Sequence, residues 1–236
     1  FEPDCHPAWA LGHKGRARVL SDIAAMGGRP LYALLSLCLP PWASRNWQKQ
    51  FFQGLFRLAE RWAVTLIGGD LAAGERLAAD IVVLGTARRG QALRRRGAGA
   101  GDILYVSGCL GGSTLGLERL RQGRGPRDPA VHRHLYPEPQ LDLGRRLVRL
   151  GATAAMDLSD GLSIDLHRLT RESGVGAEVR ADALPLFPGA SLDQVLHGGE
   201  DYELLFTLPR GRRPPSGVSE IGTITPGKHL TLVGPD

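Results

Sequence analysis

Residues 64–70 read VTLIGGD, a short apolar and β-branched run that ends in two glycines and an aspartate. Such a run is typical of a short buried strand. Glycine lets a ligand approach the backbone closely, and the end of a strand holds the next side chain in a fixed place. The stretch therefore predicts a sheet with a functional carboxylate, Asp70, at the end of a buried strand.

Strands and helices alternate on both sides of this stretch. A helix is expected from Gly12 to Met26, and a strand from Leu31 to Leu39 stops at two prolines. The alternation is too loose for a strict βαβ series, so the pattern favours an α+β or mixed α/β fold with two sheets. The other expected helices lie over 47–62, after a glycine-rich turn over 108–116, over 141–150 and from about 161. The other expected strands lie over 79–86, 103–107, 177–179 and 202–206, and one more ends at residues 156–157.

The composition divides the chain in two. After the strand over 79–86 it changes abruptly to arginine, glycine and alanine as far as Gly101. This change predicts an N-terminal domain over residues 1–96 and a C-terminal domain over residues 97–236. The chain opens with Phe1 and a polar stretch without the features of a signal peptide, so we expect it to begin inside an incomplete N-terminal domain.

Charge and cysteine content exclude several classes of protein. The net charge of +5 comes from arginine runs with almost no aromatic residues between them, which is typical of solvated faces rather than of nucleic-acid binding. The longest apolar run, Tyr32 to Leu39, is too short to cross a membrane. Three widely spaced cysteines fit neither a disulfide framework nor a zinc site, so a reducing cytoplasm is expected.

Acidic residues gather at four points where the chain switches between elements. Clusters of oxygen ligands without cysteine or histidine suit magnesium with substrate phosphates and argue against zinc. Two alternatives remain open: Asp22 as an ordinary helix charge, and Asp160 as a helix N-cap. The clusters are Ser21-Asp22, Gly68-Gly69-Asp70, Asp157-Leu158-Ser159-Asp160 and Gly198-Gly199-Glu200-Asp201.

Neither a Walker A motif nor the protein-kinase motifs are present in the sequence. If the protein transfers phosphoryl groups, it must do so on a different fold from the P-loop proteins and the protein kinases. The glycine-rich stretch over residues 106–113, VSGCLGGS, precedes an expected helix and could hold an anion at its N-terminus. A simple tight turn is the competing interpretation.

Four motifs, in this order and spacing, resemble the thiamine-monophosphate kinase family, whose superfamily includes aminoimidazole ribonucleotide synthetase. They are LSDIAAMG at 20–27, LIGGD at 66–70, DLSDGL at 157–162 and GGEDYEL at 198–204, and the resemblance extends from about Phe1 to Pro209. It implies a two-domain synthetase-like fold, and direct in-line transfer of a phosphoryl group from ATP to thiamine monophosphate with Mg²⁺. It also implies a homodimer whose nucleotide site lies near the subunit interface.

The resemblance further implies roles for individual residues. It requires no catalytic side chain, because positioning and metal ions carry the reaction. The implied residues are Asp22, Asp70, Asp157 and Asp160 for metal, Gly69, Asp70, Arg95 and Ser159 for ATP, and Glu200 for the thiamine moiety.

Three departures from the family pattern leave alternatives open. Leu71 stands where threonine is usual, Val19 where asparagine is common, and Gly112 where an acidic residue is frequent. Each removes a polar contact. The alternatives are a sister ATP-using enzyme of the superfamily, such as a synthetase or maturation factor, and a non-catalytic nucleotide-binding relative.

Overall fold

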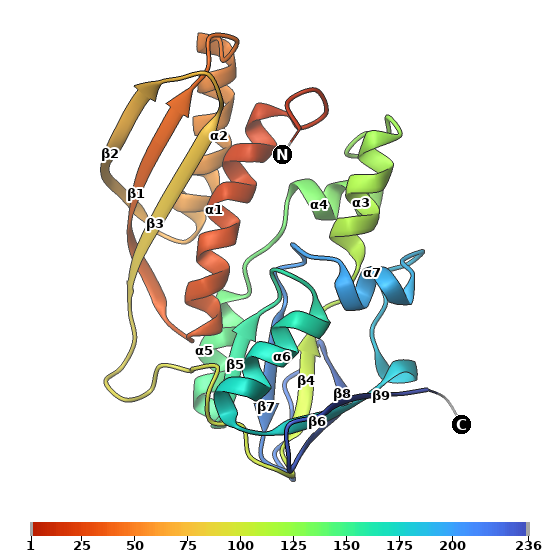
Figure 1. Cartoon of the computed structure of the whole chain (residues 1–236). Helices are drawn as coiled ribbons and strands as arrows, with labels where there is room; N and C mark the ends of the chain where they lie inside the picture. The colour runs from red at the N-terminus through yellow and green to blue at the C-terminus, as the bar shows by residue number, and fades with distance from the viewer. Residues whose placement is uncertain (1, 235–236) are drawn as a thin grey trace.

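The computed structural model describes residues 2–234, which form two sheets, each with its own helices (Figure 1). The expected mixed α/β fold is confirmed. In the first sheet the order is β2-β1-β3, with β1 parallel to β2 and antiparallel to β3. Its elements are α1 (Ala8–Ala25), β1 (Arg29–Leu39), α2 (Arg45–Arg61), β2 (Thr65–Ala73) and β3 (Ala78–Thr86).

Helices α1 and α2 cover one face of this sheet, and the opposite face is open (Figure 1). Leu35 and Leu37 of β1 pack against Phe51 and Leu55 of α2 in the core between the layers. The open face carries apolar side chains that are more than a third exposed, a pattern that marks interaction surfaces in soluble proteins. These side chains are Tyr32, Leu34, Val82 and Leu84.

The two helices cross at glycines. A Cβ atom at Gly54 of α2 would lie 1.9 Å from the carbonyl oxygen of Trp9 in α1. Backbone cannot move aside as a flexible side chain can, so the Gly54→Ala substitution must push the helices apart. We expect it to lower the free energy of unfolding by about 1–3 kcal/mol, although alanine favours helix.

Chemical denaturation of the Gly54→Ala variant measures this cost. The matched control is Gly15→Ala on α1, where the added Cβ meets only the movable end of the Ile81 side chain at 3.2 Å. The control should unfold like the parent protein or slightly later. Equal stability of both variants would contradict the close helix crossing.

The C-terminal part forms a six-stranded sheet in the order β5-β7-β4-β8-β6-β9. Its strands are antiparallel except for the β6–β9 pair. The elements are β4 (Ile103–Ser107), α3 (Gly112–Arg121), α4 (Pro129–Leu135), α5 (Leu141–Leu150), β5 (Ala154–Asp157), α6 (Leu162–Ser173), β6 (Gly176–Arg180), the 3₁₀ turn η1 (Ala181–Ala183), α7 (Leu192–His197), β7 (Leu204–Leu208), β8 (Val218–Thr225) and β9 (Leu230–Val233).

The prediction for the VTLIGGD stretch is wrong in one respect. The strand does not end before the glycines: β2 continues to Ala73, and nearly all of its residues are exposed. Asp70 therefore lies within an exposed strand, opposite Ser36 of β1. The apolar composition of residues 64–67 reflects pairing with β1 at the edge of the sheet, and not burial on both faces.

The segment that joins the two parts is hydrogen-bonded through its backbone to both of them, and the parts also touch directly. The N–H of Leu93 donates to the carbonyl of Met26, and the carbonyl of Arg94 accepts from the N–H of Ala155. Helix α5 packs so closely on α1 that a Cβ at Gly144 would lie 1.9 Å from the Ala24 carbonyl oxygen. In the described part of the chain we found no helix with the length and apolar character to cross a membrane.

Candidate active site

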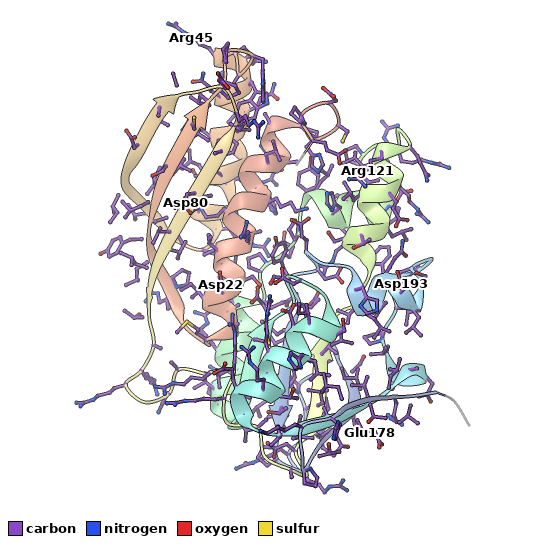
Figure 2. The ribbon with its side chains drawn as sticks, in the orientation of Figure 1. Asp22, Arg45, Asp80, Arg121, Glu178 and Asp193 are labelled. Carbon is purple, nitrogen blue, oxygen red and sulfur yellow. The ribbon has the colours of Figure 1, made fainter. Side chains whose placement is uncertain are left out.

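The carboxylates of Asp22 and Asp157 belong to different parts of the chain and lie within electrostatic reach of each other. Asp22 lies towards the C-terminal end of α1 (Figure 2), the helix that contacts β5. Asp157 is the last residue of β5 and is only 6% exposed. Burial, and then the charge of Asp22, raise the pKa of Asp157 to about 6. The negative charge of Asp22 therefore disfavours ionisation of Asp157, and a cation bound near both carboxylates would relieve this repulsion.

The neighbouring Ser21 adds an unsatisfied polar group. Its hydroxyl is fully buried and forms no hydrogen bond of normal geometry with the described residues. It nevertheless lies close enough to the Asp157 carboxylate to lower the pKa of that group, against the larger effect of burial. A hydroxyl oxygen without a hydrogen-bond partner, near two carboxylates, suits a hard cation such as magnesium, which prefers oxygen ligands.

Two arginines lie within electrostatic reach of Asp22. Burial raises the pKa of the Asp22 carboxyl, and the guanidinium groups of Arg18 and Arg95 oppose this increase. Arg95 belongs to the segment between the two sheets. Its carbonyl accepts a hydrogen bond from the hydroxyl of Ser173. The structure therefore brings three of the predicted residues together, Asp22, Asp157 and Arg95.

The GGEDYEL loop is held against the segment that follows β5. The N–H of Glu200 donates to the Ser159 carbonyl at 2.8 Å, and the N–H of Tyr202 donates to the Leu158 carbonyl at 2.9 Å. Both residues have positive φ, 65° for Glu200 and 52° for Tyr202, a conformation that non-glycine residues rarely adopt. Backbone strain of this kind is concentrated at functional sites.

Only one acidic side chain of the loop is exposed to solvent. Glu200 is 47% exposed and pairs with Lys14 of α1 at 2.7 Å. Burial opposes ionisation of Glu200, but the Lys14 ammonium outweighs it and lowers the pKa. Lys14 itself is 12% exposed, so this ion pair is fixed on the α1 side.

The other two acidic side chains of the loop hold the fold together. The buried Asp201 carboxylate accepts from the N–H groups of Gly111 at 2.6 Å and Ser113 at 3.0 Å. Glu203 is also buried, and it pairs with Arg133 and accepts from the Ser107 hydroxyl. The N-terminus of α3, which the sequence suggested as an anion site, is therefore occupied by the chain's own carboxylate.

Other predicted residues lie in different settings. Asp160 pairs with Arg168 of α6 and does not cap that helix, whose N-cap is Gly161. The N–H of Ser159 donates to the carboxylate of Asp165. Among residues 2–234, no three histidine, cysteine, aspartate or glutamate side chains stand close enough to bind a metal ion on their own.

Asp70 and Gly69 lie on the first sheet. Gly69 has a φ of 147°, and a Cβ there would lie 1.8 Å from the Leu35 carbonyl oxygen, so the close β1–β2 pairing requires glycine. No described contact joins Asp70 to the Asp22–Asp157 pair. The roles assigned to these two residues by resemblance stay predictions.

Sequence reasoning missed a buried polar cluster under Glu200. His134 is 2% exposed; its Nε2 lies 3.0 Å from His6 Nε2, and its Nδ1 lies 2.9 Å from Ser113 Oγ. Burial and the nearby Lys14 ammonium lower the pKa of His134 to about 3, so it is neutral at physiological pH. The one available signal was the position of Lys14, two helical turns before Asp22.

Comparison with known proteins agrees with this arrangement. Residues 1–87 match the family model of the AIR synthase related protein, N-terminal domain, and residues 99–234 match its C-terminal domain. The thiamine-monophosphate kinase of Salmonella typhimurium is 38% identical over 247 residues, covering 99% of this chain and 74% of that protein. The chain belongs to the thiamine-monophosphate kinase family.

Solved structures of the same family superimpose on this chain. The thiamine-monophosphate kinase of Stenotrophomonas maltophilia superimposes with a TM-score of 0.89 at 36% identity, over 98% of this chain and 80% of that one. A structure described as AaThiL complexed with AMPPCP and TMP gives a TM-score of 0.90 at 33% identity, over 96% of this chain and 77% of the other. The sequence-based assignment to thiamine-monophosphate kinases is confirmed.

Proposed function

We propose that the protein phosphorylates thiamine monophosphate to thiamine diphosphate, with ATP as the donor and by direct in-line transfer. The observation that carries this proposal is the superposition of the chain on a relative described with AMPPCP and TMP. The electrostatic effect of Asp22 on Asp157, which come from different parts of the chain, supports it. AMPPCP is an ATP analogue, so donor and acceptor analogues are both represented in that relative.

Magnesium is part of the proposal. Asp22 and Asp157 provide carboxylate oxygens, and Asp70 and Asp160 are further ligands that the family resemblance suggests. Mg²⁺ typically takes one or two carboxylates and completes its shell with phosphates and water, which fits a site with two adjacent carboxylates. Bound there, it would neutralise the charge of two phosphate groups that must approach each other.

The residues of the chain would bind and orient the substrates. A phosphate oxygen is already a good nucleophile near neutral pH, so no strong general base is needed. Arg95 would contact ATP beside Asp22, and Gly69 and Ser159 would contact the nucleotide as well. Glu200 would contact the thiamine moiety. The reaction then depends on positioning and on charge neutralisation.

Coupled measurement of ADP release tests the proposal. The full-length protein would be given ATP, Mg²⁺ and thiamine monophosphate, with unphosphorylated thiamine as the control acceptor. Release that depends on the monophosphate supports the kinase. ATP binding without release would favour a non-catalytic nucleotide-binding relative, and release with a different acceptor would favour a sister enzyme.

The role of Arg95 gives a separate prediction. The Arg95→Ala variant should raise the KM for ATP about 10-fold or more, because a charged hydrogen bond contributes about 1.5–3 kcal/mol. The KM for thiamine monophosphate should change little. Steady-state kinetics of the full-length variant provide the measurement, and an unchanged KM for ATP would show that Arg95 does not contact the nucleotide.

A homodimer and a cytoplasmic location complete the proposal. The open face of the β2-β1-β3 sheet, with its exposed apolar side chains, supports association of two copies. Light scattering after gel filtration of the full-length protein would report its mass.

The proposed cytoplasmic location is supported by the cysteines. All three are free, which suits a reducing compartment.

A further inference from the structure

Three charged side chains lie one helical turn apart on α1. They are Lys14, Arg18 and Asp22, at positions i, i+4 and i+8, so they follow one side of the helix over about 12 Å. Both ends of this row belong to the candidate site: Lys14 pairs with Glu200 at 2.7 Å, and Asp22 lies beside Asp157. The middle residue, Arg18, has no role in the site described so far.

Arg18 is an exposed cation without a carboxylate partner. It forms no ion pair within the described part of the chain, whereas the Lys14 charge is neutralised by Glu200. The Arg18 guanidinium nevertheless counteracts the effect of burial on the pKa of both Asp22 and Tyr202. Its charge therefore reaches the carboxylate on its own helix and the buried phenol of the opposite loop.

We propose that Arg18 binds the phosphate group of the acceptor and so determines the preference for a phosphorylated substrate. This inference rests on the proposed function. An acceptor that extends along α1 from Glu200 towards Asp22 would place its phosphate beside Arg18. The planar guanidinium suits a bidentate contact with two phosphate oxygens. The adjacent Val19 provides no hydrogen bond, so Arg18 is the polar group available in this turn.

The geometry also explains why Arg18 is needed in addition to metal. The Asp22–Asp157 pair brings negative charge to the place where a dianionic phosphate must come to rest. Lys14 cannot offset that charge while it is paired with Glu200. An unpaired arginine one turn from Asp22 reduces the repulsion of the acceptor without competing for the two carboxylates.

The test is a thermodynamic cycle with two changes. One change is a substitution at Arg18, and the other removes the phosphate group from the ligand. Calorimetry with the full-length protein, Mg²⁺ and AMPPCP would measure the Kd of thiamine monophosphate and of thiamine. The proteins are the parent, Arg18→Gln, Arg18→Lys, and Arg45→Gln as a matched control on an exposed arginine at the far end of the molecule (Figure 2).

We expect Arg18→Gln to weaken thiamine monophosphate binding about 10- to 100-fold, the range for a lost charged hydrogen bond. Thiamine binding should be unchanged, Arg18→Lys should be intermediate, and Arg45→Gln should behave like the parent. The KM for thiamine monophosphate should follow its Kd, while the KM for ATP stays constant.

Four results would overturn the inference. If Arg18→Gln weakened the binding of thiamine monophosphate and of thiamine equally, Arg18 would either stabilise the local structure or contact the thiamine ring. A higher KM for ATP with unchanged acceptor binding would assign Arg18 to the nucleotide. Parent-like behaviour of Arg18→Gln in an active kinase would remove this role and leave the proposed function intact, whereas a parent protein that neither binds nor phosphorylates thiamine monophosphate would end both.

Discussion

The Asp157→Asn variant of the full-length protein is expected to lose kinase turnover by at least about 100-fold and to become more stable near pH 8. Asparagine has nearly the same shape as aspartate but cannot neutralise a cation, so the proposed magnesium site loses one of its two adjacent carboxylates. The gain in stability follows from burial, because the native fold keeps a charge away from water at this position.

The direction of the pH dependence follows from the raised pKa. The folded protein holds the Asp157 proton more tightly than the unfolded chain, with a pKa of about 6 against 3.8. Stability from this group is fully present below about pH 4 and is lost as the pH rises through 6. A shift of about two units sets an upper limit near 3 kcal/mol, so we expect Asp157→Asn to gain about 1–3 kcal/mol at pH 8.

Denaturation at pH 4 and pH 8 without added metal, together with ADP release, would measure both effects. The exposed Asp142→Asn variant is the control and should change neither stability nor turnover. A variant that retains turnover would remove Asp157 from the metal site. A variant that is less stable at both pH values would mean that Asp157 has a structural role like that of Asp201.

The Glu203→Ala variant is expected to lose about 3–5 kcal/mol of stability, while Glu200→Ala, three residues earlier, loses about 1 kcal/mol or less. Glu203 is buried, and its removal leaves the largely buried Arg133 without its ion-pair partner. Glu200 is half exposed, so water can take its place beside the Lys14 ammonium after the substitution, and the cost is smaller than at the buried Glu203.

The effects on function should be the reverse. Glu200→Ala should fold normally and raise the KM for thiamine monophosphate, because Glu200 is the proposed thiamine contact. Thermal unfolding and steady-state kinetics of the two full-length variants provide the comparison. If Glu200→Ala unfolded as readily as Glu203→Ala, the separation of the loop into one binding and two structural carboxylates would be wrong.

Much of the fold could be predicted because its strands and helices are periodic or apolar. The strand over 103–107 and the helix over 141–150 were predicted with the observed bounds. Helices α4 and α7 were missed, since each is shorter than two turns and therefore too short to show a helical period of apolar residues. The exposure of β2 could not be seen either, because residues 64–67 have the composition of a buried strand.

The residues of the candidate site could be predicted where a sequence motif contains them. Contacts between segments that are distant in the sequence could not. Asp22 and Asp157 were singled out by their positions at element ends, but their closeness depends on the packing of α1 against β5. The GGEDYEL motif could not reveal which carboxylates are structural, because Asp201 and Glu203 have partners in α3, α4 and β4. The cluster around His134 joins residues 128 positions apart.

The backbone contacts between the two parts of the chain limit how the enzyme can move. Met26 and Ala155 are joined to consecutive linker residues, and Gly144 leaves no room between α5 and the Ala24 carbonyl. A jaw-like motion would have to break these contacts at once. The two parts should therefore keep their relative positions, and only substrates, side chains and bound ions should rearrange between successive turnovers.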